Sequence, residues 1–378
     1  MKVRLGEYIN EYTLRNKLDE NIPVYSVTNS QGFCRDYFGK EVASKDKKTY
    51  KIVPKGCFAY NPSRINVGSV DWQRDEERVI VSPLYNVFSV SEGLNQQYLY
   101  YYLKSDVALY YIKAVVTGSV RDNLKFSALC DFYINVPEID EQIKIVKRLD
   151  LVNAIIEDNK KKIEKLDELI KARFVEMFGD PVLNEKGWRV KPLSDMGKCK
   201  NGMNFHYDDS GVEINCLGVG DFQNLTVIDN TARLSTVSLN EMPSEEYLLR
   251  DDDIVFVRSN GNKALVGRSV AVYPGDVATT FSGFCIRYRN SDYAVIVPYL
   301  LRVLKTDSIR RKMAGRGANI QNLNQQILGT LLIPIPPIEL QNQFAAFVAE
   351  VDKSKVAVQK ALDETQTLFD SLMQEYFG

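Results

Sequence analysis

The sequence predicts a mixed α/β fold of the α+β type, built from two globular domains and two long helices that pack against each other. Three observations lead to this prediction. A heptad pattern of apolar residues runs through residues 138–179. The same pattern, with the same start and end, returns at residues 337–378. A stretch of short β-type runs precedes each pattern, so the whole chain reads as a tandem duplication.

The first long helix is indicated by apolar residues that recur in alternating steps of four and three. Such positions form one seam that faces a partner helix, as in a coiled coil. No Gly or Pro interrupts residues 138–178, and a helix of this length spans about 60 Å. A lone polar residue in the seam, here Asn159, is typical of a device that fixes the register. The seam consists of Ile145, Leu149, Val152, Ile156, Asn159, Ile163, Leu166 and Ile170.

The second long helix repeats the seam 199 positions later in the chain. Both segments begin after a proline, carry a Gln at the same place (Gln142 and Gln341) and end in Phe-Gly. Because register, start and stop agree, we expect the two helices to be partners rather than two unrelated amphipathic helices. The second seam consists of Phe344, Val348, Val351, Lys355, Val358, Leu362, Thr365 and Phe369.

The first globule, residues 1–137, combines short β-type runs with one helix. The helix is expected over residues 96–115, with Leu99, Leu103, Val107 and Tyr110 on one helical face. Its many tyrosines could serve base stacking, but a half-buried amphipathic helix is favoured. A polar loop at residues 117–124 then leads to a last strand. The expected strands are residues 22–27, 50–53, 56–60, 78–81, 85–90 and 131–136.

The second globule, residues 180–336, repeats this order. A helix around residues 299–307 echoes the first one, and a polar loop at residues 317–323 carries its Gly, Asn and Leu in matching positions. The opening parts of the two globules are the least alike. This fits two diverged copies of one binding domain joined by the long helices. It fits equally an old duplication whose surface residues have changed without selection. The expected strands are residues 213–219, 253–257, 266–272, 283–288 and 330–335.

Composition excludes several classes of protein. The 378 residues carry a net charge of -1, with 45% hydrophobic and 26% charged residues, as in an ordinary globular chain. The chain has no run of apolar residues long enough for a membrane helix and begins with no signal peptide, so we expect a cytoplasmic protein. The six cysteines contain no C-x-x-C pair, which argues against a zinc site. The single histidine, His206, is more typical of a surface loop than of catalysis.

No catalytic motif is complete in this chain. The phosphate-binding G-x-x-x-x-G-K-[ST] motif is absent, and residues 218–222 contain only G-x-G, which favours a tight turn. Residues 61–64 begin like the N-P-P-Y motif of amino-methyltransferases, but the third and fourth residues differ. The carboxylates at residues 251–253 favour a solvated turn over a metal site. We therefore expect a non-catalytic chain without a metal or cofactor of its own.

Polar and basic loops are the remaining candidates for function. Arg pairs with guanine edges, Asn pairs with adenine edges, and Lys and Ser commonly contact phosphates. The alternative is that these loops are simply solvated. The predicted DNA-contacting residues are Lys45, Lys47, Lys48, Asn61, Arg64 and Arg121 in the first globule, and Arg258, Ser259, Asn260, Asn262, Lys263, Arg268 and Arg316 in the second.

Taken together, these residues resemble the specificity subunit of bacterial type I restriction-modification enzymes. The resemblance covers essentially the whole chain. It is carried by the helix starts at residues 136–142 and 335–341, the two Phe-Gly ends, the loop at residues 118–124, and residues 217–222 and 253–259. Each motif is degenerate, but their order and duplication are specific.

The resemblance implies four parts: target recognition domain 1 at residues 1–137, a central helix at 138–179, target recognition domain 2 at 180–336 and a C-terminal helix at 337–378. The helices would form an antiparallel coiled coil with pseudo-two-fold symmetry. Each domain would read one half of a bipartite double-stranded DNA site, and the coil would set the spacing.

The resemblance also implies partners. Two methyltransferase subunits and two restriction subunits would complete the enzyme, and S-adenosylmethionine, ATP and Mg²⁺ would bind to those subunits. Two alternatives stay open at this point: a stand-alone duplicated DNA-binding regulator, and a scaffold that binds only proteins.

Overall fold

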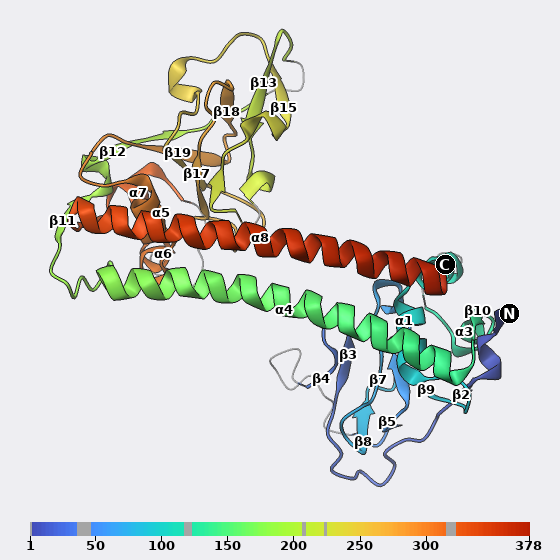
Figure 1. Cartoon of the computed structure of the whole chain (residues 1–378). Coiled ribbons are helices and arrows are strands. Elements are labelled where there is room, and N and C mark those ends of the chain that lie inside the picture. The colour runs from blue at the N-terminus through green and yellow to red at the C-terminus, as the bar shows by residue number, and fades with distance from the viewer. Residues whose placement is uncertain (1, 36–46, 117–122, 206–208, 223–224, 315–322) are drawn as a thin grey trace. The chain divides into compact units, whose positions relative to one another are not determined.

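The computed structural model describes residues 2–35, 47–116, 123–205, 209–222, 225–314 and 323–378. The chain divides into two compact units (Figure 1). Unit 1 consists of Met1–Lys162 with Val358–Gly378, and unit 2 consists of Ile163–Ala357. Each unit therefore contains one globule and a part of both long helices.

The globule of unit 1 is built on a small antiparallel sheet with the strand order β2-β9-β6-β7. Three further strand pairs, β3-β4, β5-β8 and β1-β10, form separate two-stranded sheets. The strands are β1 (Lys2–Arg4), β2 (Ile9–Glu11), β3 (Ser26–Thr28), β4 (Gly32–Cys34), β5 (Lys51–Pro54), β6 (Phe58–Tyr60), β7 (Val70–Trp72), β8 (Arg78–Val81), β9 (Asn86–Val90) and β10 (Tyr133–Asn135). The helices are η1 (Leu5–Glu7), η2 (Ile65–Val67), α1 (Gln96–Lys104), α2 (Asp106–Val116) and α3 (Phe126–Cys130).

The predicted single helix at residues 96–115 is wrong in one respect, because it breaks into α1 and α2 at Ser105. The Ser105 hydroxyl donates to the Tyr102 carbonyl (2.7 Å) and accepts the Ala108 N–H (3.3 Å), which caps the second helix. The break changes the direction of the chain. Leu99 in α1 is buried as expected. Tyr110 in α2 is 70% exposed, because α2 does not continue the face of α1.

The globule of unit 2 contains a five-stranded sheet with the strand order β12-β19-β16-β17-β14 and a three-stranded sheet with the order β15-β13-β18. Strand β11 pairs with β20, as β1 does with β10. The strands are β11 (Arg189–Pro192), β12 (Gly197–Asn201), β13 (Val212–Leu217), β14 (Val227–Ile228), β15 (Thr236–Leu239), β16 (Asp253–Val257), β17 (Ser269–Val272), β18 (Thr279–Phe281), β19 (Cys285–Asn290) and β20 (Leu332–Ile335). The helices are η3 (Leu193–Asp195), η4 (Val219–Phe222), η5 (Thr231–Arg233), η6 (Glu245–Tyr247), α5 (Val297–Lys305), α6 (Asp307–Ala314) and α7 (Gln325–Gly329).

The two long helices are present as predicted, α4 (Ile139–Phe178) and α8 (Ile338–Phe377). They run antiparallel within each unit. In unit 2, the Lys355 ammonium lies 2.7 Å from the Asp167 carboxylate, and the rings of Phe178 and Phe344 lie 5.5 Å apart. In unit 1, Arg148 donates to the Tyr376 hydroxyl (3.1 Å). The residues of both seams are buried or half-buried along their whole length.

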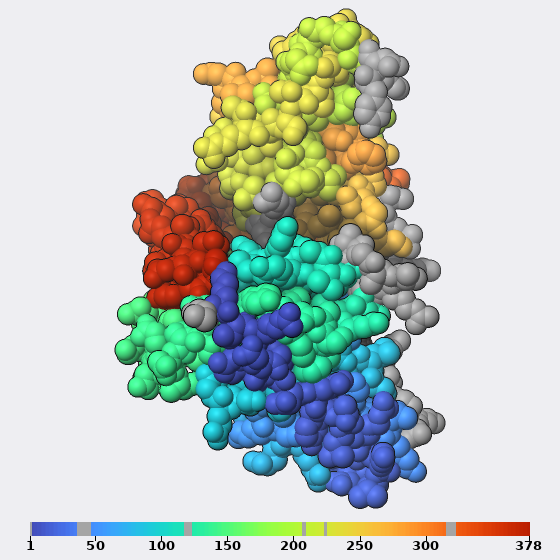
Figure 2. All heavy atoms as spheres, turned by 90° about the vertical axis from the view of Figure 1, so that its right-hand side faces the viewer, coloured from blue at the N-terminus to red at the C-terminus, as the bar shows by residue number. Residues whose placement is uncertain are grey.

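Each globule holds the end of the long helix that starts from the other half of the sequence. In unit 1 the ring of Phe377 packs 5.0 Å from the ring of Tyr98, whose hydroxyl donates to the Asn135 carbonyl. In unit 2 the ring of Phe178 packs 4.8 Å from the ring of Tyr299, whose hydroxyl donates to the Pro334 carbonyl. Figure 2 shows the C-terminal part of α8 in red beside the start of the chain in blue. The duplication therefore extends to individual contacts.

Among the described residues, no helix has the length and apolar character needed to cross a membrane.

Candidate nucleic-acid interface

Each unit presents a loop that connects a central strand of its sheet to the antiparallel strand paired with it. In unit 1, residues 61–69 connect β6 to β7, and we call this segment the first hairpin loop. In unit 2, residues 258–268 connect β16 to β17 and form the second hairpin loop. Because β6 and β16 are flanked by strands on both sides, the roots of both loops are fixed by the sheet.

The two hairpin loops are anchored in the same way. The Leu124 N–H donates to the Pro62 carbonyl (3.1 Å), and the Leu323 N–H donates to the Arg258 carbonyl (3.0 Å). Both loops also turn through a glycine with a left-handed backbone, Gly68 at φ 87° and Gly267 at φ 78°. The two leucines and the two glycines lie 199 positions apart in the chain, the offset of the duplication, so the loops are equivalent at these anchors.

A cation holds the turning glycine in each loop. The Lys104 ammonium donates to the Gly68 carbonyl, and the Arg310 guanidinium donates to the Gly267 carbonyl (2.9 Å). Burial lowers the pKa of Lys104, and burial likewise lowers the pKa of Arg310. A partly desolvated positive charge therefore lies under each loop, where it favours an anion above it.

Most of the predicted DNA-contacting residues lie on these two loops, and the structure brings them together within each unit. The first hairpin loop carries Asn61 and Arg64, and the second carries Arg258, Ser259, Asn260, Asn262, Lys263 and Arg268. Lys47 and Lys48 lie elsewhere, in the turn before β5. Lys45, Arg121 and Arg316 lie outside the described residues, as does His206.

Asparagine oxygens shape the loops. In the first, the Asn61 side-chain oxygen accepts the Ser63 N–H (3.1 Å) and the Ser63 hydroxyl (2.9 Å). In the second, Asn260 accepts the Asn262 N–H (2.8 Å), and Asn262 accepts the Ala264 N–H (3.1 Å). These are Asx-type turns, in which the side chain replaces a backbone acceptor. Their side-chain nitrogens, which are donors, make no hydrogen bond to a described residue and can serve a ligand.

Several cations lie near Lys305 at the end of α5. Burial, together with the neighbouring cations Arg302 and Lys355, lowers the pKa of Lys305 to about 8. Arg268 of the loop contributes to the same effect, and the Asp167 carboxylate opposes it. A polyanion placed here would relieve the repulsion between like charges.

The predicted solvated turn at residues 251–253 is wrong for Asp253. Its carboxylate is fully buried and accepts two hydrogen bonds from the Arg289 guanidinium, at 2.8 and 2.7 Å. Asp251 and Asp252 are exposed, as expected of a turn. The prediction of a tight turn at residues 218–222 is confirmed, because the Gly218 N–H donates to the Asp221 carboxylate at 2.7 Å.

Sequence reasoning missed Lys104 and Arg310 under the loops and Asn29 beside the first one. Lys104 was visible as the repeat of Lys305, but nothing local indicates that its ammonium reaches Gly68. Within the described part of the chain, no group of three or more His, Cys, Asp or Glu side chains is placed to hold a metal ion.

Comparison with known proteins gives a consistent result. A family model described as the type I restriction modification DNA specificity domain matches the chain twice, at residues 3–168 and 185–365. The StySPI specificity subunit of Salmonella potsdam is 23% identical over 98% of this chain and 84% of its own length. The EcoKI specificity subunit of Escherichia coli K12 is 24% identical over 70% of this chain and 60% of its own length.

Part of the chain resembles a relative more strongly. The MjaIX specificity subunit of Methanocaldococcus jannaschii is 34% identical over 41% of this chain and 38% of its own length. Among solved structures, a chain from a type I R-M system has a TM-score of 0.59 at 17% identity, covering 100% of this chain and 97% of that one. The S subunit from M. genitalium has a TM-score of 0.55 at 15% identity, covering 100% and 96%. These two structures share the fold.

Proposed function

Since the chain belongs to the type I restriction-modification DNA specificity family, we propose that its two hairpin loops each contact one half of a bipartite DNA site. The chain is the DNA specificity subunit of such a system, with two recognition domains, and is a non-catalytic recognition subunit. The comparisons do not favour a stand-alone duplicated regulator.

The observation that carries the proposal is the equivalence of the two hairpin loops. Both loops leave a central strand, turn at a left-handed glycine and rest on a half-buried cation, Lys104 of α1 or Arg310 of α6. Their exposed side chains nevertheless differ: Arg64 projects from the first loop, and Asn262 and Lys263 project from the second. Two domains that recognise different half-sites need loops of the same backbone geometry that carry different polar side chains.

The long helices would act as the spacer between the two readers. When two weak readers are joined by a stiff connection, binding of the second half-site becomes an intramolecular event at a high effective concentration. The length of the helices would then determine the number of unread base pairs between the half-sites. Membership in the family supports this role for α4 and α8.

The partners follow from the kind of system to which the chain belongs. DNA, methyltransferase subunits and restriction subunits are its partners, and we propose two copies of each subunit. In this scheme S-adenosylmethionine, ATP and Mg²⁺ are bound by those subunits and not by this chain. We further propose that the chain acts in the cytoplasm, where its DNA substrate lies.

Methylome sequencing tests the proposed function directly. The gene is expressed with its methyltransferase partner in a host without type I systems, and a matched strain lacks only this gene. We expect a new bipartite methylated motif that depends on the gene. Methylation that is absent, or that is the same in both strains, would contradict the proposal.

A second pair of strains tests the role of each hairpin loop separately. Exchange of the first hairpin loop for the sequence of a different specificity subunit should alter one half of the motif and leave the other half and the spacing unchanged. A regulator that acts without a methyltransferase would bind DNA but produce no methylated motif. A scaffold would show no affinity for DNA that falls with salt concentration.

A further inference from the structure

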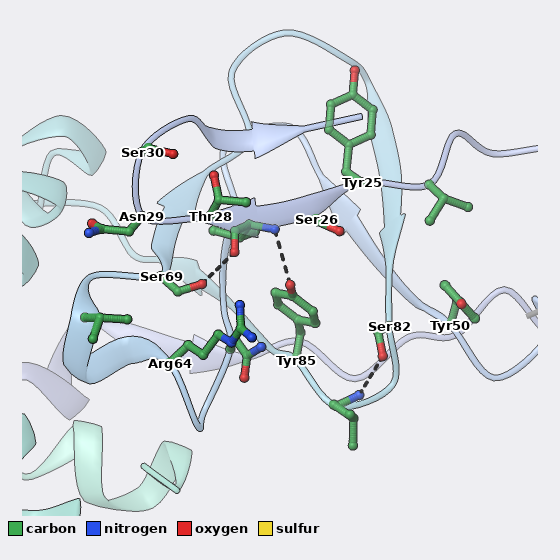
Figure 3. Close-up of a pocket in the computed structure, with 15 residues that line it drawn as sticks. Tyr25, Ser26, Thr28, Asn29, Ser30, Tyr50, Arg64, Ser69, Ser82 and Tyr85 are labelled. Carbon is green, nitrogen blue, oxygen red and sulfur yellow. Dashed lines mark hydrogen bonds between the residues drawn. The ribbon is translucent and has the colours of Figure 1, made fainter. Parts of the chain in front are cut away.

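A cavity of about 620 Å³ opens beside the first hairpin loop in unit 1 (Figure 3). One side is strand β3 with the turn that follows it, including Thr28, Asn29 and Ser30. The hairpin loop forms the opposite side with Asn61 and Arg64. The turn between β8 and β9 closes the cavity with Leu84 and Tyr85. Three segments that are far apart in the sequence therefore meet around one space.

The floor of this cavity is rigid because the backbone of Val27 is held from two sides. Its N–H donates to the Tyr85 hydroxyl (3.4 Å), and its carbonyl accepts the Ser69 hydroxyl (2.5 Å). Ser69 is the last residue of the hairpin loop, so the same bond ties the loop to β3. Figure 3 shows both bonds as dashed lines. A cavity whose walls are fixed to each other places its polar groups before a ligand arrives.

The polar groups at the mouth of the cavity have free hydrogen-bonding capacity. Arg64 is exposed and forms no ion pair with a described residue. Asn29 is exposed, and its side-chain amide has no hydrogen bond to a described residue. The side-chain nitrogen of Asn61 also has no hydrogen bond to a described residue, since only its oxygen shapes the turn. The cavity thus offers a guanidinium and two amides.

The remaining lining matches the edge of a base pair better than a bare phosphate. None of the lining residues is acidic. Two apolar side chains stand at the rim, Val67 at 55% and Leu84 at 77% exposure. A phosphate needs only cations and N–H donors, whereas a base edge presents donors, acceptors and, for thymine, a methyl group. Guanidinium, amide and apolar groups together suit the second kind of surface.

We propose that this cavity is the base-reading site of the first recognition domain, and that Arg64 and Asn29 determine its half of the DNA sequence. The ligand is the major-groove edge of two base pairs in the same half-site, with Arg64 suited to a guanine in one pair and Asn29 to an adenine in the other. This inference rests on the proposed function, since it assigns particular residues to one of the two half-sites.

The experiment combines the methylome assay with single variants of the full chain, co-expressed with the methyltransferase partner. Arg64→Ala and Asn29→Ala should each relax one base position in the same half of the motif. Loss of a bidentate base contact corresponds to a discrimination that falls by roughly 5- to 150-fold at that position. The other half-site and the spacing should not change, and their retention shows that the variant is folded.

Matched controls lie on the same globule and do not line the cavity. Lys17→Ala removes an exposed positive charge, and Asn21→Ala removes an exposed amide. Both should leave the motif as in the wild type. Arg64→Lys keeps the charge but loses the planar fork, so it should relax the same position as Arg64→Ala.

The outcomes separate this inference from the proposed function. No bipartite motif with the wild-type chain means that the proposed function itself fails. A wild-type motif that persists at every position in both Arg64→Ala and Asn29→Ala overturns the base-reading site alone. Methylation that weakens equally at all sites in Arg64→Ala and recovers in Arg64→Lys also overturns it, because that result assigns Arg64 to the phosphate backbone.

Discussion

Gln142 and Gln341 make the same three hydrogen bonds at the start of the two long helices, and both side chains are fully buried. Gln142 accepts the Asn95 N–H (2.8 Å) and donates to the carbonyls of Gly93 (2.8 Å) and Pro137 (2.7 Å). Gln341 accepts the Ile296 N–H (3.0 Å) and donates to the carbonyls of Ala294 (2.9 Å) and Pro336 (2.8 Å). Each glutamine therefore fastens a long helix to the segment that starts α1 or α5.

Replacing either glutamine by alanine should destabilise the unit that contains it. The change leaves three backbone groups without a partner, and we expect a loss of roughly 2–4 kcal/mol in the free energy of unfolding. Urea denaturation measures the loss in the free energy of unfolding. Hydrogen exchange of the amides in α1 and α5 then shows which unit is affected. Gln343→Ala, an exposed change two residues after Gln341, should have almost no effect. Equal losses in the Gln343 and Gln341 variants would contradict the structural role.

The buried carboxylate of Asp253 supports a second prediction. It holds Arg289 through two hydrogen bonds, and the Arg287 guanidinium lies 3.9 Å away. Asp253→Ala would leave a buried positive charge without its counter-ion, at a cost of about 3–5 kcal/mol in the free energy of unfolding. The measurement is the midpoint of chemical unfolding, with Asp276→Ala at an exposed site as control. A loss below about 1 kcal/mol for Asp253→Ala would mean that the pair is not desolvated.

The long helices could be predicted from sequence because their information is local and periodic. The seam positions, the paired glutamines and the Phe-Gly ends repeat at fixed spacing, and the structure contains both helices with the predicted start and end. Strands β8 and β16 were predicted to the residue, since apolar runs bounded by polar turns define them. The helix break at Ser105 was not, because a serine is tolerated inside a helix and only its capping bonds mark the boundary.

The candidate site was predicted only in part, since its geometry is non-local. Polar composition alone indicated Asn61 and Arg64, but it did not indicate Asn29, which β3 brings to the same cavity. Similarly, three successive aspartates look like a solvated turn until the sheet places Arg289 opposite Asp253. Strand pairing between distant segments places Asn29 at the cavity and Arg289 opposite Asp253. No periodic pattern in the sequence indicates which strands pair.

The last residues of the chain should stabilise the first globule. Phe377 is buried against Tyr98 and Tyr102, although more than half of the sequence separates them. Phe377→Ala should cost unit 1 about 3 kcal/mol in the free energy of unfolding through lost contact and a cavity. Hydrogen exchange should accelerate in α1, while α5 keeps its protection. Glu375→Ala, an exposed neighbour, serves as the control, and unchanged exchange in α1 of the Phe377 variant would contradict the packing.

Lys305 should make the stability of unit 2 depend on pH in a defined window. Its pKa is lowered from 10.5 to about 8. Between these values the unfolded chain holds more protons than the folded one, so raising the pH favours folding, whereas below pH 8 the lysine is charged in both states.

Lys305→Met should therefore be more stable than the wild type at pH 7, and this advantage should shrink as the pH rises toward 10. Thermal unfolding of both proteins at several pH values gives the difference, in which the titration of cysteines and tyrosines cancels. Lys312→Met, at an exposed site of α6, should show no such trend, and a Lys305 difference that grows with pH would contradict the prediction.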